Sequence, residues 1–306
     1  MRIAVMGAGG VGGYFGAQLA RAGHDVAFIA RGAHLAALRE RGLTVESAVA
    51  PVQSMPVRAV DDPAQLAPVD VVMFCVKLWD VEAAAPKIAP LLVDGGIAIP
   101  FQNGVDSHRV LMRVLGAART AGGVAQIGAL IRAPGVIAHT GSMARLRVGA
   151  FAGGPQAAVQ SFVAAGRSAG IEVEYADDIN RVLWEKFVFL VAMSGVTALA
   201  RQPIGVVRAD PDLRAALAAS MRETVAVAAA QGVVFDDGFV DRQMGFVDGL
   251  PAEMRSSMLN DLVAGNRLEA PWLAGAVVRM AAAAGLAAPV SSTIYAAMKP
   301  YVSGVR

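Results

Sequence analysis

The chain has 306 residues, which is enough for two domains with sizeable cores. Hydrophobic residues make up 55% and charged residues 17%, a composition typical of a globular protein and not of a disordered one. The 27 basic and 25 acidic residues leave a net charge of +2, and no stretch concentrates Lys and Arg. Nucleic acid is therefore not an expected partner.

Cysteine and histidine usage argues against disulfides and metal centres. The single cysteine, Cys75, has no internal partner and lies in the apolar run 71–76, so we expect a buried strand residue there. Ligand spacing is missing among the four scattered histidines, so no metal is predicted; these are His24, His34, His108 and His139.

Membrane insertion and export are not expected either. The N-terminal residues 1–13 contain several glycines and lack the long apolar core of a signal peptide. The most apolar internal run, residues 187–200, is shorter than a bilayer span requires. We therefore predict a cytoplasmic protein with no membrane partner.

Strands and helices alternate in the first half of the chain. The patterns predict strands over residues 2–6, 25–30, 70–76 and 95–100, with helices over 12–22 and 33–41. Such alternation predicts a parallel sheet with helices on both faces. Residues 44–58 are expected to form a shorter β segment, and the pattern does not give its place in the sheet. Further β-rich segments over 119–131 and 136–148 follow, and the sheet is expected to end near Tyr175.

The pattern changes from Asn180 onward. Long stretches rich in Ala, Leu and Met recur at helical spacing between prolines and glycines, so the fold class is α/β, with an N-terminal parallel-sheet domain (residues 1–175) and an all-helical C-terminal domain (residues 176–306). Trp272, Met280 and Tyr295 on the Ala-rich stretches fit either a homodimer interface or an ordinary core, and the sequence does not decide between them.

The first predicted strand leads into a glycine fingerprint, Gly7-Ala8-Gly9-Gly10-Val11-Gly12, which fits G-x-G-x-x-G. In a dinucleotide site, Gly7 makes the tight turn, Gly9 lets backbone approach a pyrophosphate and Gly12 permits close helix packing. The following helix then directs its free N–H groups at the phosphates. The position between a strand and a helix makes this motif specific.

The second predicted strand ends at Arg31, where NAD-binding proteins usually carry Asp or Glu. A guanidinium suits the 2′-phosphate of NADP, because its planar donors match phosphate oxygens. The alternative is an exposed Arg in a solvated turn. The sequence thus predicts NADPH as the cofactor and residues 1–175 as its binding domain.

Lys77 and Asn103 each follow a predicted strand. Ligands of open α/β sheets bind beyond the carboxyl ends of strands, so both residues are candidates for cofactor and substrate contacts. A surface lysine and a turn-forming Asn-Gly pair are the plain alternatives.

Lys186 lies in an apolar helical segment, residues 182–190. A lone ammonium there is costly unless it has a partner or a chemical role, although it could also extend to the surface beside Glu185. Ser256 and Ser257 precede another helical segment and could simply cap it.

Taken in order, these motifs resemble the ketopantoate reductase (2-dehydropantoate 2-reductase) family over nearly the whole chain. The matching segments are 7–12, Val76-Lys77, Gln102-Asn103-Gly104-Val105, Leu183-Trp184-Glu185-Lys186, Ser256-Ser257-Met258-Leu259 and Asn266-Arg267-Leu268-Glu269.

The resemblance implies NADPH-dependent reduction of 2-dehydropantoate to (R)-pantoate, a step of pantothenate biosynthesis. It assigns Lys186 as the catalytic lysine and proton donor and Glu269 as an active-site glutamate. Lys77, Asn103, Ser194 and Ser257 correspond to substrate-contacting positions, the first two also facing the nicotinamide. Burial should lower the pKa of Lys186 from roughly 10.4 and a close carboxylate should raise it, so Glu269 either orients the lysine or binds a substrate hydroxyl.

Two positions depart from the family. Leu190, four residues after Lys186 on the same helical face, stands where the family typically has a substrate-binding asparagine, and Ser194 stands where it has another. A missing amide leaves substrate polar groups unpaired, at a cost on the order of 1 to 3 kcal/mol when buried. A related reductase of a more apolar 2-keto acid is therefore the main alternative. A 3-hydroxy-acid or glycerol-phosphate dehydrogenase fits the later motifs less well, and a non-catalytic NADP sensor would not need Lys186 and Glu269.

Overall fold

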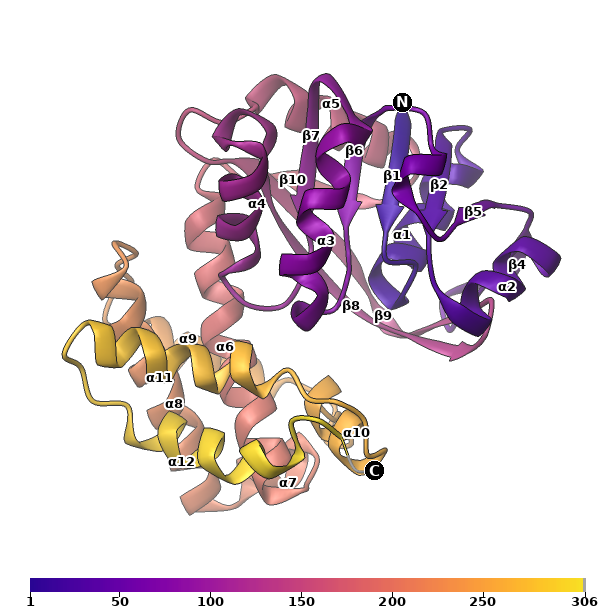
Figure 1. Cartoon of the computed structure of the whole chain (residues 1–306). Coiled ribbons are helices and arrows are strands. Elements are labelled where there is room, and N and C mark those ends of the chain that lie inside the picture. The colour runs from indigo at the N-terminus through magenta and orange to yellow at the C-terminus, as the bar shows by residue number, and fades with distance from the viewer. Residues whose placement is uncertain (305–306) are drawn as a thin grey trace. The chain divides into compact units, whose positions relative to one another are not determined.

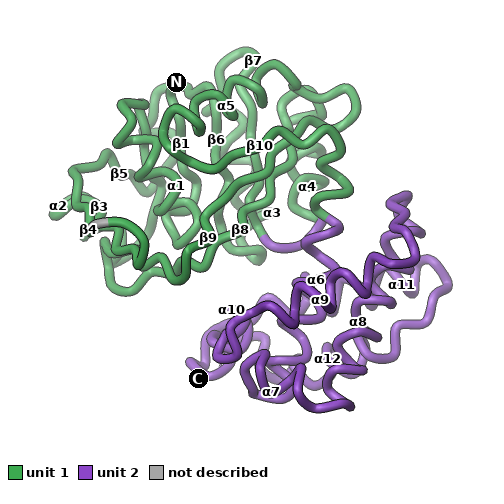
Figure 2. The backbone as a smooth tube through the Cα atoms, turned by 180° about the vertical axis from the view of Figure 1, so that it is seen from behind, with its two compact units in different colours: residues 1–102, 106–183 green, residues 103–105, 184–306 purple. Residues whose placement is uncertain are grey.

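The computed structural model describes residues 1–304, which fall into two compact units (Figure 2). One unit comprises residues 1–102 and 106–183, and the other comprises residues 103–105 and the chain from 184 onward. The division falls inside helix α6 (Ile179–Ala200). The boundary that the sequence suggests, between residues 175 and 176, lies just before this helix, directly after the last strand.

A parallel sheet forms the centre of the first unit (Figure 1). Within the described residues its strand order is β5-β2-β1-β6-β7, and every neighbouring pair is parallel. The bounds are β1 (Arg2–Met6), β2 (Asp25–Ile29), β5 (Arg58–Val60), β6 (Val69–Phe74) and β7 (Leu92–Pro100). This arrangement confirms the predicted α/β class and Rossmann-like sheet.

Alternate residues of each central strand enter two different cores. In β1, Ile3 and Val5 join the core with helices α1 (Gly10–Arg21) and α5 (Gln156–Ser168). Ala4 and Met6 join the core with α3 (Val81–Ile88) and α4 (Ser107–Leu115) on the opposite face. Because both faces are covered, these strands are apolar throughout, as parallel strands usually are.

A second, mixed sheet packs in the same unit, where the sequence suggested a single sheet ending near Tyr175. Its order is β10-β9-β3-β4, with β8 paired to β9. The strands are β3 (Leu43–Ser47), β4 (Ala50–Met55), β8 (Ala121–Ala133), β9 (Val136–Ala150) and β10 (Glu172–Tyr175). Strand patterns mark β structure but do not specify the partner strand, so one-sheet and two-sheet arrangements look alike in sequence.

Helix α1 touches both sheets because its glycines remove side chains at the points of contact. A Cβ on Gly16 would lie 2.6 Å from Cε1 of Phe28 in β2. A Cβ on Gly13 would lie 2.7 Å from Cγ1 of Ile137 in β9. Even one methyl group on either face would therefore push a sheet away.

Helices make up the second unit from residue 184 on. After α6 come α7 (Ile204–Ala209), α8 (Pro211–Ala230), α9 (Phe239–Asp248), α10 (Ser257–Val263), α11 (Ala274–Ala283) and α12 (Pro289–Met298). The first unit also contains α2 (Gly32–Arg41). Short 3-10 turns are η1 (Pro63–Gln65), η2 (Leu78–Asp80), η3 (Ala89–Leu91), η4 (Ala117–Arg119), η5 (Ala270–Trp272) and η6 (Lys299–Tyr301).

Helix α6 is longer than the apolar run 187–200 suggests, with 22 residues. Within the described chain it is the one helix long and apolar enough to cross a membrane by length and composition. Inside the protein, however, 72% of its most apolar window is buried, as in the core helix of a globular fold.

A carboxylate from α8 caps the start of α12. Ala288 precedes α12 and has no side chain that can cap it. Glu223 instead accepts hydrogen bonds from the backbone N–H of Val290 at 2.7 Å and of Ser291 at 2.8 Å, and from the Ser291 hydroxyl at 2.7 Å. A negative group at a helix N-terminus also interacts favourably with the helix dipole.

Replacement of this carboxylate should destabilise the helical unit. Glu223→Ala removes three hydrogen bonds to a charged acceptor, and we expect the free energy of unfolding to fall by about 1 to 3 kcal/mol. Urea unfolding followed by tryptophan fluorescence measures it, since Trp184 and Trp272 both belong to this unit. Exposed Glu253→Ala is the control, and an equal loss in both variants would contradict the capping role.

Candidate active site

The fingerprint turn directly follows β1 and packs against the backbone of Cys75 and Val76. Gly7 has φ +102°, in the region that favours glycine, and a Cβ there would lie 2.8 Å from the carbonyl carbon of Cys75. A Cβ on Gly12 would collide with the Gly7 carbonyl oxygen and lie 2.7 Å from Cγ1 of Val5. Gly7 and Gly12 thus make the tight turn and the close helix packing that the motif requires.

Gly9 differs, because a Cβ built on it would meet no atom within 4 Å outside its immediate neighbours in residues 1–304. Helix α1 begins at Gly10, earlier than the predicted residue 12, and Gly13 N–H donates to the Gly9 carbonyl at 2.6 Å. Open space at Gly9 beside the free N–H groups of a helix start fits a pyrophosphate. Gly10 has a further role: a Cβ on it would collide with the Ala129 carbonyl of β8.

His34 of α2 links the fingerprint turn to the second sheet, a role that sequence reasoning missed. Its Nε2 lies 2.8 Å from the carbonyl oxygen of Ala8, and its Nδ1 accepts the Gly135 N–H at 3.0 Å. Burial lowers the pKa of His34, while the bond to Ala8 opposes this. One neutral tautomer, with the proton on Nε2, satisfies both bonds. An isolated histidine gives no sequence signal for such a contact.

Loss of the His34 imidazole should loosen the turn. In His34→Ala the Ala8 carbonyl and the Gly135 N–H lose their partner, and we expect the Kd of a nicotinamide dinucleotide to rise about fivefold, the equivalent of about one hydrogen bond. Titration calorimetry measures it. His24→Ala is the matched control, because Nε2 of His24 meets the Ala165 carbonyl at the long distance of 3.4 Å, away from the fingerprint turn. Unchanged affinity in His34→Ala would refute the positioning role.

Arg31 and Lys77 follow the ends of two strands that flank β1. The Arg31 side chain is 77% exposed, and its Nη2 donates to Oδ2 of Asp80 at 2.7 Å. Lys77 is exposed, with its Nζ 5.5 Å from the ring centre of Trp79. Cys75 lies one residue beyond β6 and is half-buried, so it is not the buried strand residue expected.

In the helical unit, Lys186 and Asn103 meet across a long sequence separation. Lys186 Nζ donates to Oδ1 of Asn103 at 3.0 Å. Asn103 precedes Gly104, whose φ of +98° turns the chain. Lys186 is held by rigid packing on α6: Trp184 and Phe187 on either side are 1% exposed, and their rings meet edge to face at 5.4 Å.

The electrostatics of this pair suit proton transfer. Burial lowers the pKa of Lys186 from 10.5 to about 8, and the charge of Glu269 partly opposes the shift. The lysine is therefore mostly protonated at neutral pH but can lose its proton at modest cost. Glu269 is half-buried and precedes η5. Three candidate residues, Lys186, Asn103 and Glu269, are thus brought together.

Leu190 and Ser194 continue the α6 face of Lys186 at intervals of four residues. Leu190 is half-buried. Ser194 is fully buried, and its Oγ has no hydrogen-bond partner within the described chain. A buried unpaired hydroxyl costs stability, so such an atom is a candidate for ligand contact.

The two adjacent serines have separate roles. Ser256 is the N-cap of α10, and its Oγ accepts the Leu259 N–H at 3.1 Å and contacts the Thr197 hydroxyl at 2.8 Å. Ser257 is exposed in the first turn, and among described residues no hydrogen bond joins it to Lys186. The capping alternative thus applies to Ser256 and leaves Ser257 accessible.

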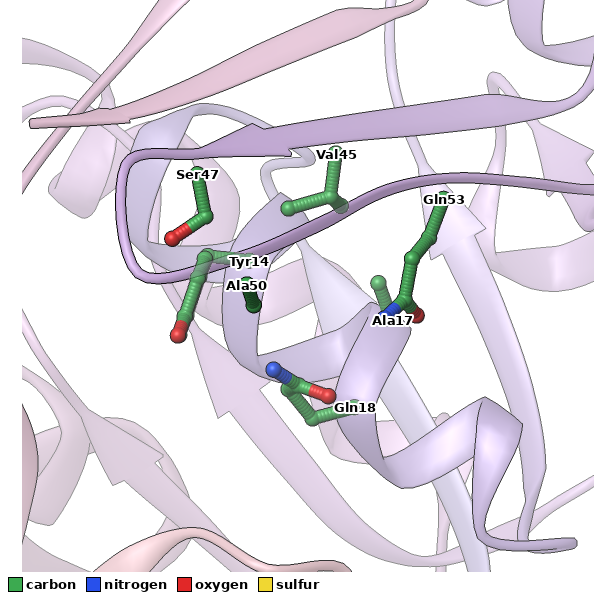
Figure 3. A pocket seen from close by; sticks show the side chains of 7 residues that line it. All are labelled: Tyr14, Ala17, Gln18, Val45, Ser47, Ala50 and Gln53. Atoms are coloured by element: carbon green, nitrogen blue, oxygen red, sulfur yellow. The ribbon is translucent and has the colours of Figure 1, made fainter.

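A small cavity lies in the first unit, between α1 and the hairpin of β3 and β4 (Figure 3). Its volume is about 10 Å³, room for one water molecule and too little for a keto acid. It is lined by Tyr14, Ala17, Gln18, Val45, Ser47, Ala50 and Gln53. Across residues 1–304, no group of three or more His, Cys, Asp or Glu side chains could hold a metal ion.

A dinucleotide fingerprint on a parallel sheet, in one chain with a helical unit that carries a partly buried lysine, is the plan of a nicotinamide-dependent oxidoreductase. The chain belongs to the ketopantoate reductase PanE/ApbA family: residues 3–153 match the model of that name, and residues 178–302 match its C-terminal counterpart. The resemblance drawn from the sequence motifs is confirmed.

Individual relatives agree. The chain is 32% identical to the 2-dehydropantoate 2-reductase of Archaeoglobus fulgidus, over 99% of both chains. A crystal structure of a PanE/ApbA family ketopantoate reductase from Ralstonia eutropha superposes with a TM-score of 0.89 at 31% identity, covering 99% of this chain and 98% of the other. A D-mandelate dehydrogenase bound to NADH and anilino(oxo)acetate gives a TM-score of 0.90 at 19% identity over 99% and 98%, a likeness of fold alone.

Proposed function

We propose that this protein reduces 2-dehydropantoate to (R)-pantoate with NADPH, the reductive step of pantothenate biosynthesis, in the cytoplasm. The observation that carries the proposal is the Lys186 ammonium, bonded to Asn103 at 3.0 Å with its pKa lowered to about 8, in a chain of the ketopantoate reductase family. When bound, the reduced nicotinamide supplies a hydride to the keto carbon.

Lys186 stabilises the negative charge that develops on the carbonyl oxygen and donates a proton to it. The bond to Asn103 fixes the direction of the ammonium, and partial burial strengthens its charge interactions. Glu269 has two roles open to it: it orients Lys186, or it accepts a hydrogen bond from a substrate hydroxyl. Substrate contacts are assigned to Lys77, Asn103, Ser194 and Ser257 besides this pair.

The first unit carries the residues that would bind the cofactor. The backbone of residues 7–12 would hold the pyrophosphate, Arg31 the 2′-phosphate, and Lys77 the nicotinamide side. The space at Gly9 and the start of α1 at Gly10 support this assignment. The nicotinamide cofactor itself is common to the family, and the preference for NADPH is our proposal. The expected partner is thus a small keto acid, and the sequence leaves open whether the chain forms a homodimer.

One observation favours a second function. Leu190 occupies the helical position next to Lys186 where the family has an amide, and it is half-buried with no polar atom to offer. A 2-keto acid without a terminal hydroxyl would leave fewer polar groups unpaired there. Reduction of a more apolar 2-keto acid is therefore the competing activity.

The rate of keto-acid reduction should depend on pH through Lys186. Only the protonated amine can donate, so kcat/KM should be constant below about pH 8 and fall tenfold per unit above it. Stopped-flow or steady-state oxidation of NADPH between pH 6 and 10 measures the profile. Lys186→Ala should lower kcat by about 100- to 10,000-fold.

Two variants sharpen this result. Lys186→Arg keeps the positive charge but holds its proton throughout this range, so its lower activity should lack the alkaline decline. Exposed Lys299→Ala should retain the wild-type profile. A decline near pH 8 that persists in Lys186→Arg would assign the titration to another group. A protein that binds NADPH but turns over no keto acid would point to a cofactor sensor.

A comparison of two substrates tests which keto acid is used. 3-Methyl-2-oxobutanoate has the skeleton of 2-dehydropantoate without the hydroxymethyl group. We expect kcat/KM to favour 2-dehydropantoate by about tenfold or more, the equivalent of about one hydrogen bond to its hydroxyl. Leu190→Asn should increase that preference. If the wild type prefers 3-methyl-2-oxobutanoate and Leu190→Asn reverses this preference, the competing activity is established instead.

A further inference from the structure

Asp80 forms an ion pair with the arginine assigned to the cofactor phosphate. Oδ2 of Asp80 accepts from Nη2 of Arg31 at 2.7 Å. The Arg31 side chain is 77% exposed and that of Asp80 only 25%, so the acid is the more fixed partner. Sequence reasoning did not single out Asp80, since 49 residues separate it from Arg31.

The topology explains how these residues meet. Met6, Ile29 and Phe74 end the adjacent strands β1, β2 and β6 at the same level of the sheet. Arg31 follows β2, and Asp80 ends η2 beyond β6. Because β1 lies between these strands, the pair extends across the end of β1, where the fingerprint turn begins, a span of about 10 Å between strands.

Two electrostatic consequences follow for a dinucleotide. A 2′-phosphate carries between one and two negative charges near neutral pH, so it would compete with the Asp80 carboxylate for one guanidinium and be repelled by it. A ribose 2′-hydroxyl has no such charge, and a carboxylate can accept its hydrogen bond, as acidic residues do in NAD sites.

We infer that Asp80 is a cofactor-specificity residue, which holds the Arg31 guanidinium and reduces the advantage of a 2′-phosphorylated nucleotide over its unphosphorylated form. This inference rests on the proposed cofactor site of the first unit. It is independent of which keto acid the helical unit accepts.

A structural role for this carboxylate is the rival explanation. Asp80 precedes α3 at its N-cap position, where an acidic side chain often caps the helix. Among the described residues, however, the Asp80 side chain makes no capping hydrogen bond. Asp80→Asn therefore removes the charge that faces Arg31, and the start of α3 loses no capping hydrogen bond.

Nucleotide fragments test the inference without turnover. Adenosine 2′,5′-bisphosphate and adenosine 5′-monophosphate are titrated calorimetrically into the full chain. We expect Asp80→Asn to bind the bisphosphate about fivefold more tightly than the wild type, with little change for the monophosphate. The gain should shrink at high salt, because the pair is solvent-exposed, and in an Arg31→Ala background, where the competition is absent.

The matched control is Glu82→Gln, which removes the same charge two residues away, where Glu82 pairs with exposed Arg113 at 2.7 Å. Equal gains in both variants, or unchanged or weaker bisphosphate binding in Asp80→Asn, overturn the inference. A wild type that binds both nucleotides equally, with a bisphosphate preference appearing in Asp80→Asn, supports it while refuting the NADPH preference. Failure to reduce 2-dehydropantoate leaves this result untouched.

Discussion

The close approach of α1 to two sheets is the constraint on which the first unit depends. Gly12 and Gly16 face the parallel sheet, while Gly10 and Gly13 face the mixed one, and a Cβ at any of the four would meet an atom at 2.7 Å or less. The glycines of the fingerprint and of α1 thus serve packing, and the proposed cofactor site uses the same turn. Because the turn proposed to hold a pyrophosphate also joins the two sheets, a substitution that alters the packing would also alter the proposed site.

The helical unit depends on a different balance. Lys186 lies in a helix whose other side chains are mostly apolar, so burial disfavours its charge while Glu269 favours it. The resulting pKa of about 8 leaves an amine that is mostly protonated at neutral pH and can still donate its proton. Asn103 adds direction to this charge. The charge state and the orientation of one ammonium are therefore set by residues far apart in the chain.

The elements and site residues that could be predicted are those that depend on residues close together in the sequence. Strands 2–6 and 25–29 and the fingerprint turn follow from apolar runs and glycine spacing, which act between near neighbours. The pairing of the later strands into a separate sheet does not, because a strand pattern carries no information about its partner. Likewise, the sequence presented both Ser256 and Ser257 as capping candidates, and the hydrogen bonds of Ser256 with the Leu259 N–H and the Thr197 hydroxyl separate them.

The sequence by itself determined the α/β class, the family, the dinucleotide turn and the lysine that stands out in an apolar helix, because each depends on residue types at short, fixed spacing. The tertiary structure alone decided the contacts between distant residues: Lys186 with Asn103, His34 with the fingerprint turn, and Arg31 with Asp80. Hydrogen bonds and charge interactions act over a few ångströms of space, and chain folding sets those distances independently of sequence separation.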